Sequence, residues 1–491
     1  MLDETTNLKS LLADPALLEE RAFMDGAFGE GDSGTFEVTN PARGDVIARV
    51  ADCSRDQVAG AIDAAAAAQK DWAAHTGKER AAILRRWFEL MMENQEDLAI
   101  IMTAEQGKPL SESRGEIAYA AGFIEFSGEE AKRIYGETIP GHQRDKRITV
   151  IRQPVGVAAS ITPWNFPAAM ITRKAAPALA AGCAFIGRPA SETPLSATAL
   201  AVLAERAGVP AGVFSIVPSS RSSEIGREFC ENEKIRKLTF TGSTEVGRLL
   251  LRQAADQIKK CSMELGGNAP FLVFDDADLD AAVEGAIASK FRNNGQTCVC
   301  ANRIYVQSGV HDAFAEKLAA RVAELRVGDG LEEGTELGPL INTAAIDKVR
   351  EHIADATEKG ARIVHGGIED NMPGSFLRPT VLTGVTQEMA VAHEETFGPL
   401  APLFRFETEE EAIRLANDTI YGLASYFYAR DIGRVTRVQE GLEYGIVGVN
   451  TGLISTEVAP FGGVKQSGLG REGGHHGVEE FLEVKYICTS V

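Results

Sequence analysis

The cysteines of "GQTCVCANR", Gly295 to Arg303, are well placed to do chemistry, and the 491-residue chain holds only seven cysteines. Cys298 follows a Gly-Gln-Thr turn, which would expose its sulfur and aim backbone N–H groups at it, as a nucleophile requires. Zinc binding is the weakest alternative, because no Cys or His cluster lies near the pair in sequence, and no metal is expected. A buried structural thiol remains open. So does a disulfide with Cys300, although side chains two apart in a strand diverge from bridging geometry.

A carboxylate is the favoured base for such a nucleophile, because none of the eight histidines lies in a recognisable motif. The stretch "MELGG" places Glu264 at a predicted strand end, before two glycines that allow another chain or a ligand to approach closely. An apolar setting raises the pKa of a carboxyl group and suits it to act as a base. A salt bridge at the strand end is the alternative interpretation.

A third stretch, "FTGSTEVG", lies between a predicted strand and a predicted helix. Gly242, Ser243 and Gly247 occupy a junction where free backbone N–H groups and the helix dipole favour a phosphate. An ordinary capped helix start explains the same residues. Two G-x-G-x-x-G matches, residues 29–34 and 468–473, follow no predicted strand and are interpreted as turns.

The elements that must position these residues alternate as in an α/β protein. Short β-rich runs such as "GCAFIGRP", "GVFSIVPSS" and "IRKLTFTGS" are separated by helical stretches, which predicts βαβ units on a parallel sheet. Apolar residues at helical spacing follow the third run: Val246, Leu249, Leu250, Ala254 and Ile258. A second predicted helix, residues 275–291, ends near an Asn-Asn-Gly stop signal just before the cysteine pair.

Composition and charge exclude several classes of function. The length suggests roughly three domains. The formal charge of −20 argues against nucleic acid and anionic membranes as partners, and means that a small anionic substrate would need a local positive site. The N-terminus does not resemble a signal peptide. The longest apolar stretch, residues 175–187, is shorter than the roughly 20 residues of a membrane span. The scattered, odd-numbered cysteines favour a reducing cytoplasm.

Six stretches together resemble the aldehyde dehydrogenase superfamily, and most closely its succinate-semialdehyde dehydrogenase branch. They run from about residue 20 to the C-terminus, in the family's order: "TPWNFPAAMITRKAAPALAAGC", "LTFTGSTEVGRLL", "MELGGNAPFLVF", "NNGQTCVCANR", "EETFGP" and "PFGGVKQSGLGREG".

The resemblance implies a catalytic role for three residues. Cys298 would be the nucleophile, Glu264 the general base and Asn165 the side-chain donor of an oxyanion hole. A thiolate would add to the aldehyde, the Asn165 amide and the Cys298 backbone N–H would hold the oxyanion, and Glu264 would activate the water that releases the acid. In some relatives, a Cys-x-Cys pair joins under oxidation, and we extend that hypothesis to Cys298 and Cys300.

The resemblance also implies a dinucleotide site. Its residues would be Trp164, Gly242, Ser243, Gly247, Leu265, Glu395 and Phe397. Arg188 replaces the family's usual lysine at the adenine ribose, and Ser191 stands where a glutamate often selects NAD. Because a guanidinium suits a 2′-phosphate, NADP is the expected cofactor and NAD the alternative. Glu192 and Ser219 weaken that inference.

The branch holds the far carboxylate of its substrate with two arginines and a serine, and Arg173, Arg292 and Ser455 stand at those positions. The expected activity is the oxidation of succinate semialdehyde in GABA degradation. Another acid semialdehyde, such as glutarate semialdehyde, is the alternative substrate. An inactive binding or structural protein with the same fold is the alternative of another class.

The implied architecture is α/β, with a Rossmann-type cofactor domain, an α/β catalytic domain and a small β oligomerisation arm. The expected boundaries are residues 1–133 and 155–264 for the cofactor domain, 265–478 for the catalytic domain, and 134–154 with 479–491 for the arm. A homodimer or homotetramer is expected.

Overall fold

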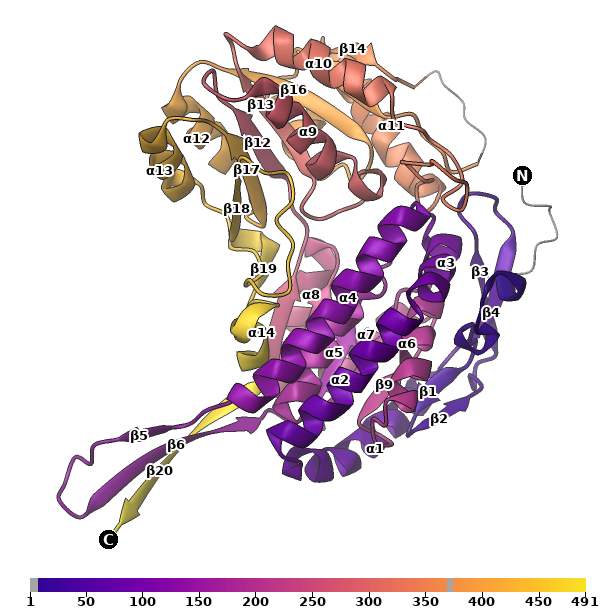
Figure 1. Cartoon of the computed structure of the whole chain (residues 1–491), viewed down its shortest axis with the longest axis vertical. Coiled ribbons are helices and arrows are strands. Elements are labelled where there is room, and N and C mark those ends of the chain that lie inside the picture. The colour runs from indigo at the N-terminus through magenta and orange to yellow at the C-terminus, as the bar shows by residue number, and fades with distance from the viewer. Residues whose placement is uncertain (1–7, 369–373) are drawn as a thin grey trace.

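The computed structural model describes residues 8–368 and 374–491. The N-terminal segment that was predicted not to be a signal peptide therefore lies partly outside the described residues. The described chain forms an eight-stranded, a seven-stranded, a three-stranded and a two-stranded sheet, with helices packed around the two large ones (Figure 1). The predicted α/β class is therefore confirmed.

The eight-stranded sheet has the order β19-β11-β10-β7-β8-β9-β1-β2, and β11 to β9 are parallel. Every residue of β7 and β8 is buried, as expected of strands covered on both faces. The strands are β1 (Ala22–Met24), β2 (Ala27–Gly29), β7 (Val157–Ile161), β8 (Ala184–Arg188), β9 (Phe214–Ile216), β10 (Ile235–Thr241), β11 (Lys260–Glu264) and β19 (Gly468–Leu469). Strand β19 joins this sheet from within the range expected for the catalytic domain.

Helices of the first half of the chain surround this sheet (Figure 1). They are α1 (Arg55–Ala74), α2 (Gly77–Glu93), α3 (Gln95–Gln106), α4 (Leu110–Glu130), α5 (Ala169–Ala181), α6 (Pro194–Arg206), α7 (Ser222–Glu231) and α8 (Thr244–Ala254). The prediction of a helix after β10 is confirmed, but the helix ends at Ala254, before the last predicted apolar residue. Ile258 lies beyond α8 in a left-handed conformation and is 93% exposed.

The seven-stranded sheet has the order β14-β15-β16-β13-β12-β17-β18, parallel except for β14. Its strands are β12 (Ala269–Val273), β13 (Ala301–Gln307), β14 (Arg362–His365), β15 (Thr380–Thr383), β16 (Leu400–Phe406), β17 (Ala424–Tyr428) and β18 (Ile446–Val449). The helices of this part of the chain are α9 (Leu279–Lys290), α10 (His311–Ala323), α11 (Thr343–Glu358), α12 (Glu409–Asn417) and α13 (Ile432–Gly441). Helix α9 confirms the predicted second helix, and a short 3-10 turn, Arg292–Gly295, follows it.

The three-stranded sheet extends away from the body as an arm, with the C-terminus near its end (Figure 1). It pairs β5 (Glu137–Ile139), β6 (Lys146–Pro154) and β20 (Leu482–Ser490) in antiparallel fashion, and a short helix, α14 (Gly474–Glu479), precedes β20. The remaining two strands, β3 (Thr35–Thr39) and β4 (Val46–Ala51), form a hairpin near the N-terminus.

The chain passes from the eight-stranded sheet to the seven-stranded sheet through residues 265–268, between β11 and β12. The turn between β10 and α8 lies beside this crossing, since β10 and β11 are paired in parallel. Cys298 lies between the 3-10 turn after α9 and β13, which is the direct neighbour of β12. Carboxyl ends of parallel strands are a common place for a ligand crevice.

Candidate active site

A cavity of about 240 Å³ opens beside the Cys298 thiol. Its walls come from the turn after β10, the β11–β12 crossing, the loop before α5 and the segment before β16. It is lined by Pro163, Trp164, Asn165, Met170, Thr241, Gly242, Ser243, Leu265, Gly266, Cys298, Glu395 and Phe397. Eight of these residues are site residues predicted from the sequence. Met170, Thr241 and the remaining lining residues were missed, because apolar and small side chains carry no chemical signal of their own.

A tight turn presents Cys298 to this cavity. The Cys300 N–H donates to the Thr297 carbonyl at 2.9 Å, which closes the turn around the thiol. Gly295 must be glycine, because its φ is +76° and a Cβ would lie 2.2 Å from the Gly398 carbonyl oxygen. Cys298 is half-buried, and burial raises the pKa of its thiol to about 12, although the positive charge of Arg173 opposes that rise.

Cys300 has a different environment from its neighbour. It is fully buried, its Sγ donates to the Lys290 carbonyl at 3.5 Å, and burial raises its pKa. Both thiols are free in the structure, and a disulfide between them under oxidation stays a prediction.

The Glu264 carboxyl group ends β11 as predicted and is buried without a partner. Only 2% of the residue is exposed, and neither carboxyl oxygen has a hydrogen-bond partner in the described part of the chain. Burial, together with the negative charge of Glu472, raises the pKa of Glu264 well above its ordinary value. A Cβ on Gly462 would lie 2.9 Å from Glu264 Oε1, so the carboxyl group lies against Gly462 and does not line the cavity.

A buried charge cluster lies next to Glu264. The Glu472 carboxylate pairs with both Arg173 and Lys174, and all three side chains are almost fully buried. The Arg173 guanidinium also stacks over the Phe461 ring, at 4.5 Å from its centre. Its Nη2 has no hydrogen-bond partner among the described residues. Sequence reasoning missed Lys174 and Glu472, because they are 298 positions apart and neither belongs to a local motif for such a pair.

The two predicted arginines of the carboxylate site both influence Tyr119. Burial raises the pKa of this tyrosine, and the positive charges of Arg173 and Arg292 both oppose the rise. Arg292 also stacks over Phe166 at 4.9 Å. The third predicted residue, Ser455, is half-buried in the loop between β18 and β19.

Six of the predicted dinucleotide residues line the cavity, namely Trp164, Gly242, Ser243, Leu265, Glu395 and Phe397. Ser243 caps α8, and its side chain accepts from the Val246 N–H at 3.3 Å. Gly247, in the first turn of α8, is packed against Leu265. Glu395 accepts from the Gly267 N–H at 3.1 Å, and burial raises its pKa to about 8.

Two aromatic residues that line the cavity, Trp164 and Phe397, pack against each other. The Phe397 and Trp164 rings meet edge to face, with their centres 5.6 Å apart. This perpendicular contact fixes one ring against the other and keeps an apolar surface facing the cavity.

Arg188 ends β8 and is only 6% exposed. Its Nη2 donates to the Ser219 carbonyl at 2.8 Å and to the Ser222 hydroxyl at 2.6 Å. Burial lowers the pKa of Arg188 to about 10, and its Nε has no hydrogen-bond partner in the part of the chain that the structure describes. Ser191 donates to the Glu192 carboxylate at 3.2 Å.

Residues 28–487 match the model of the aldehyde dehydrogenase family. This chain belongs to the aldehyde dehydrogenase family. It is 64% identical over 481 residues to a glutarate-semialdehyde dehydrogenase of Pseudomonas putida strain KT2440, covering 98% of this chain and 100% of that protein. It is 62% identical over 481 residues to the NADP(+) succinate-semialdehyde dehydrogenase GabD of Escherichia coli K12, again covering 98% and 100%.

A crystal structure of succinate-semialdehyde dehydrogenase from Burkholderia pseudomallei superposes on this aldehyde dehydrogenase with a TM-score of 0.97. The two chains are 61% identical, and the match covers 98% of this chain and 100% of the other. The predictions of the family, the fold class and an oxidoreductase are therefore confirmed. In residues 8–368 and 374–491, no three His, Cys, Asp or Glu side chains are grouped as metal ligands, and no helix is apolar and long enough for a membrane span.

Proposed function

We infer that this aldehyde dehydrogenase oxidises an aldehyde with a distant carboxylate, namely succinate semialdehyde, to the corresponding acid. The observation that carries the inference is the buried guanidinium of Arg173, whose Nη2 has no hydrogen-bond partner among the described residues. In a chain of net charge −20, the buried Arg173 and the half-buried Arg292 would supply positive charge to such a substrate. The partnerless Nη2 of Arg173 offers a donor to a substrate carboxylate.

In this proposal, the Cys298 thiol loses its proton to water and attacks the aldehyde carbon as a thiolate, so that a C–S bond forms while the carbonyl oxygen becomes an oxyanion. The new oxyanion lies against the Cys298 backbone N–H and the Asn165 amide, each donor contributing about 3 kcal/mol to barrier lowering. One hydrogen of Asn165 Nδ2 donates to the Gln296 carbonyl at 3.0 Å, which leaves the second hydrogen for the oxyanion. After oxidation of the carbon, Cys298 holds the acyl group as a thioester.

Glu264 then acts as the base that activates water for thioester hydrolysis. A partnerless buried carboxyl group with a raised pKa is suited to accept a proton. Because it lies against Gly462, the carboxyl group must turn toward the cavity to reach a water beside Cys298.

The residues on the other side of the cavity fit a dinucleotide. The N-terminus of α8, with Gly242 and Ser243, offers N–H groups to a phosphate, and the partnerless Nε of Arg188 offers a further donor. NADP is the proposed cofactor and NAD the alternative, with Glu395, Phe397, Trp164 and Leu265 along the nicotinamide end. A dinucleotide held by these residues would supply the acceptor for the hydride that the aldehyde carbon loses.

The three parts of the chain divide this work. We assign the cofactor to residues 1–133 and 155–264, and the thiol to residues 265–478. We assign self-association to the arm, as a homodimer or homotetramer. The arm exposes apolar side chains, among them Tyr135 at 71% and Val484 at 60%, which a second copy of the chain would cover. The seven free thiols suit the cytoplasm, where GABA degradation is the proposed setting.

Glutarate semialdehyde is the second candidate substrate, since a relative of nearly equal identity is named for it. A panel of aldehydes of increasing chain length, with and without a terminal carboxylate, tests the proposal with both cofactors. We expect the highest kcat/KM for the four-carbon semialdehyde with NADP. Equal kcat/KM for charged and uncharged aldehydes would contradict the proposed carboxylate site. A fivefold or greater preference for the five-carbon acid, on the order of 1 kcal/mol, would favour the alternative substrate.

A further inference from the structure

We propose that Lys108 and Glu116 form a positioning pair for Asn165, which holds that residue in the geometry that oxyanion binding requires. The proposal rests on the oxyanion role of Asn165 given above. Neither residue of the pair lines the cavity, and no sequence motif pointed to either one.

The pair is an ion pair in the interior of the protein. Lys108 Nζ and Glu116 Oε2 are 2.5 Å apart, and each side chain is 1% exposed. Burial lowers the pKa of Lys108, while the charge of Glu116 opposes that change. Because removing two charges from water commonly cancels most of their attraction, net stability is a weak explanation for such a pair. The polar groups that the pair holds are a better guide to its role.

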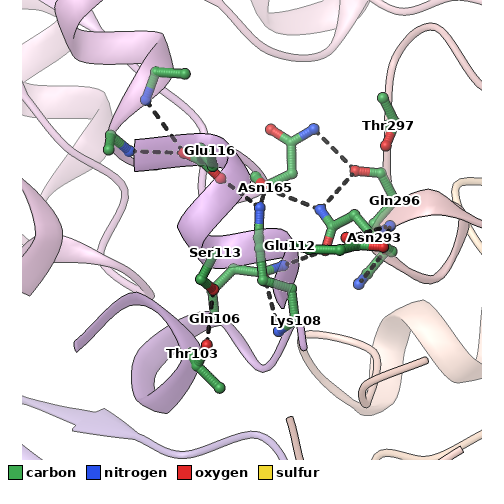
Figure 2. Close-up of polar contacts among 12 residues, drawn as sticks. Thr103, Gln106, Lys108, Glu112, Ser113, Glu116, Asn165, Asn293, Gln296 and Thr297 are labelled. Carbon is green, nitrogen blue, oxygen red and sulfur yellow. Dashed lines mark hydrogen bonds and ion pairs between the residues drawn. The ribbon is translucent and has the colours of Figure 1, made fainter. Parts of the chain in front are cut away.

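Lys108 holds the backbone of Asn165 directly. Its Nζ donates to the Asn165 carbonyl oxygen at 2.7 Å, and Asn293 Nδ2 donates to the same oxygen at 2.9 Å (Figure 2). Two donors on one carbonyl fix the plane of that peptide. The Asn165 side chain leaves the backbone next to this plane, so its direction toward the cavity is set by the same contacts.

Glu116 holds the other end of the same loop. Its Oε1 accepts from the Ala168 N–H at 3.0 Å and from the Ala169 N–H at 3.2 Å. These groups begin α5, whose N-cap residue is Ala168 and therefore has no side chain able to cap the helix. A carboxylate from α4 thus satisfies the free donors and the positive end of the helix dipole. One ion pair therefore fixes the loop at Asn165 and again three residues later.

The same network reaches the segment that presents the thiol. Asn165 Nδ2 and Asn293 Nδ2 share the Gln296 carbonyl, at 3.0 and 3.3 Å. Gln106 links the two sides, because its Nε2 donates to Asn293 Oδ1 at 3.1 Å and its Oε1 accepts from the Lys108 N–H at 2.9 Å. Figure 2 shows these residues gathered around Asn165. The amide donor and the turn before the thiol are therefore held relative to each other.

The test removes both charges at once, in Lys108→Met/Glu116→Gln, so that no unpaired charge stays buried. We expect kcat with succinate semialdehyde to fall about 10-fold, since small misplacements of a catalytic group cost up to about 100-fold. We expect KM to change less than about twofold. The rate at which iodoacetamide alkylates Cys298 should stay the same, because alkylation needs no oxyanion donor.

A matched control is Lys237→Met/Glu480→Gln. This pair is 3.1 Å apart, Lys237 is fully buried, and its Nζ donates to Ser262 instead of to the loop of Asn165. We expect this variant to lower Tm and to leave kcat unchanged. If Lys108→Met/Glu116→Gln fails to fold, the same measurements are made on Lys108→Gln/Glu116→Gln, which keeps an N–H donor in place of the lysine.

The deciding experiment repeats the charge removal in Asn165→Ala. If the pair acts through Asn165, it should cost less than about twofold in kcat in that background. A 10-fold loss in both backgrounds, or full kcat in the double variant itself, would overturn the positioning role and leave the proposed function intact. An Asn165→Ala enzyme with normal kcat would instead remove the oxyanion role, and the positioning role with it.

Discussion

Glu264 and Glu116 are both buried carboxyl groups near α5, but they differ in the hydrogen-bond donors around them. Glu116 uses its two oxygens for one lysine and two backbone N–H groups at the start of the helix. Glu264 has no hydrogen-bond partner among the described residues, and a raised pKa reflects its burial.

The difference shows how one protein assigns two roles to one residue type. A carboxylate whose two oxygens both accept hydrogen bonds holds its neighbours in place. A carboxyl group left without donors is easily protonated and free to turn, which are the properties of a base that works on a water.

The largest expected effect is at Cys298 itself. Cys298→Ser should lower kcat by about 10⁴-fold or more, because a serine hydroxyl is a far weaker nucleophile than a thiolate. Steady-state cofactor reduction measures the loss, and Cys300→Ser serves as a control that should keep at least half of the activity. Cofactor reduction by Cys298→Ser at the normal rate would contradict the role of Cys298 as the nucleophile.

The second-largest effect comes from changing Glu264 or Glu116 to glutamine, which should affect activity in one case and stability in the other. Glu264→Gln should lower kcat by about 10³-fold with no loss of stability, since a neutral amide is cheaper to bury than a charge. Glu116→Gln should lower the free energy of unfolding by about 3 kcal/mol, because Lys108 loses its partner. Thermal unfolding and steady-state kinetics of both variants test this prediction. Equal losses of stability would contradict the different roles of the two carboxyl groups.

A smaller effect is expected at the carboxylate site. Arg292→Ala should raise KM for succinate semialdehyde roughly 10- to 100-fold, the range for a lost hydrogen bond to a charged group. KM for an uncharged aldehyde of equal length should change less than about twofold. Parallel increases for both aldehydes would argue that Arg292 acts only through its stacking on Phe166.

The smallest effect concerns the pH dependence of thiol alkylation. Because the pKa of Cys298 is raised to about 12, the cofactor-free enzyme should react with iodoacetamide faster at each higher pH, with no plateau below pH 10. The negative charge of Glu264 contributes to that raised pKa, so Glu264→Gln should shift the profile to slightly lower pH and Glu116→Gln should not. A plateau near pH 8 would contradict the buried setting of the thiol.

The sequence predicts the parts of the site that lie in short contiguous stretches. Asn165, Gly242 and Cys298 each follow a strand or helix end within a recognisable motif, and all three line one cavity. Pairings between distant segments had no such signal. Lys108 meets Asn165 across 57 positions and Lys174 meets Glu472 across 298, and only the folded chain brings them together.

Periodicity was also insufficient to place the end of a helix. The apolar spacing that starts at Val246 continues to Ile258, yet α8 ends at Ala254, a 3-10 turn follows, and Ile258 is exposed. Spacing reports which residues share a face, but the stop depends on backbone conformations that the side-chain pattern does not encode.

Trapping the acyl-enzyme shows whether the acyl group is carried by Cys298 and released with the help of Glu264. Glu264→Gln should be mixed with succinate semialdehyde and NADP, quenched in acid, digested and examined by mass spectrometry. We expect a burst of about one reduced cofactor per subunit and a succinyl thioester on the peptide that carries Cys298. Continuous turnover with an unmodified Cys298, or an acyl group on any other residue, would contradict this mechanism.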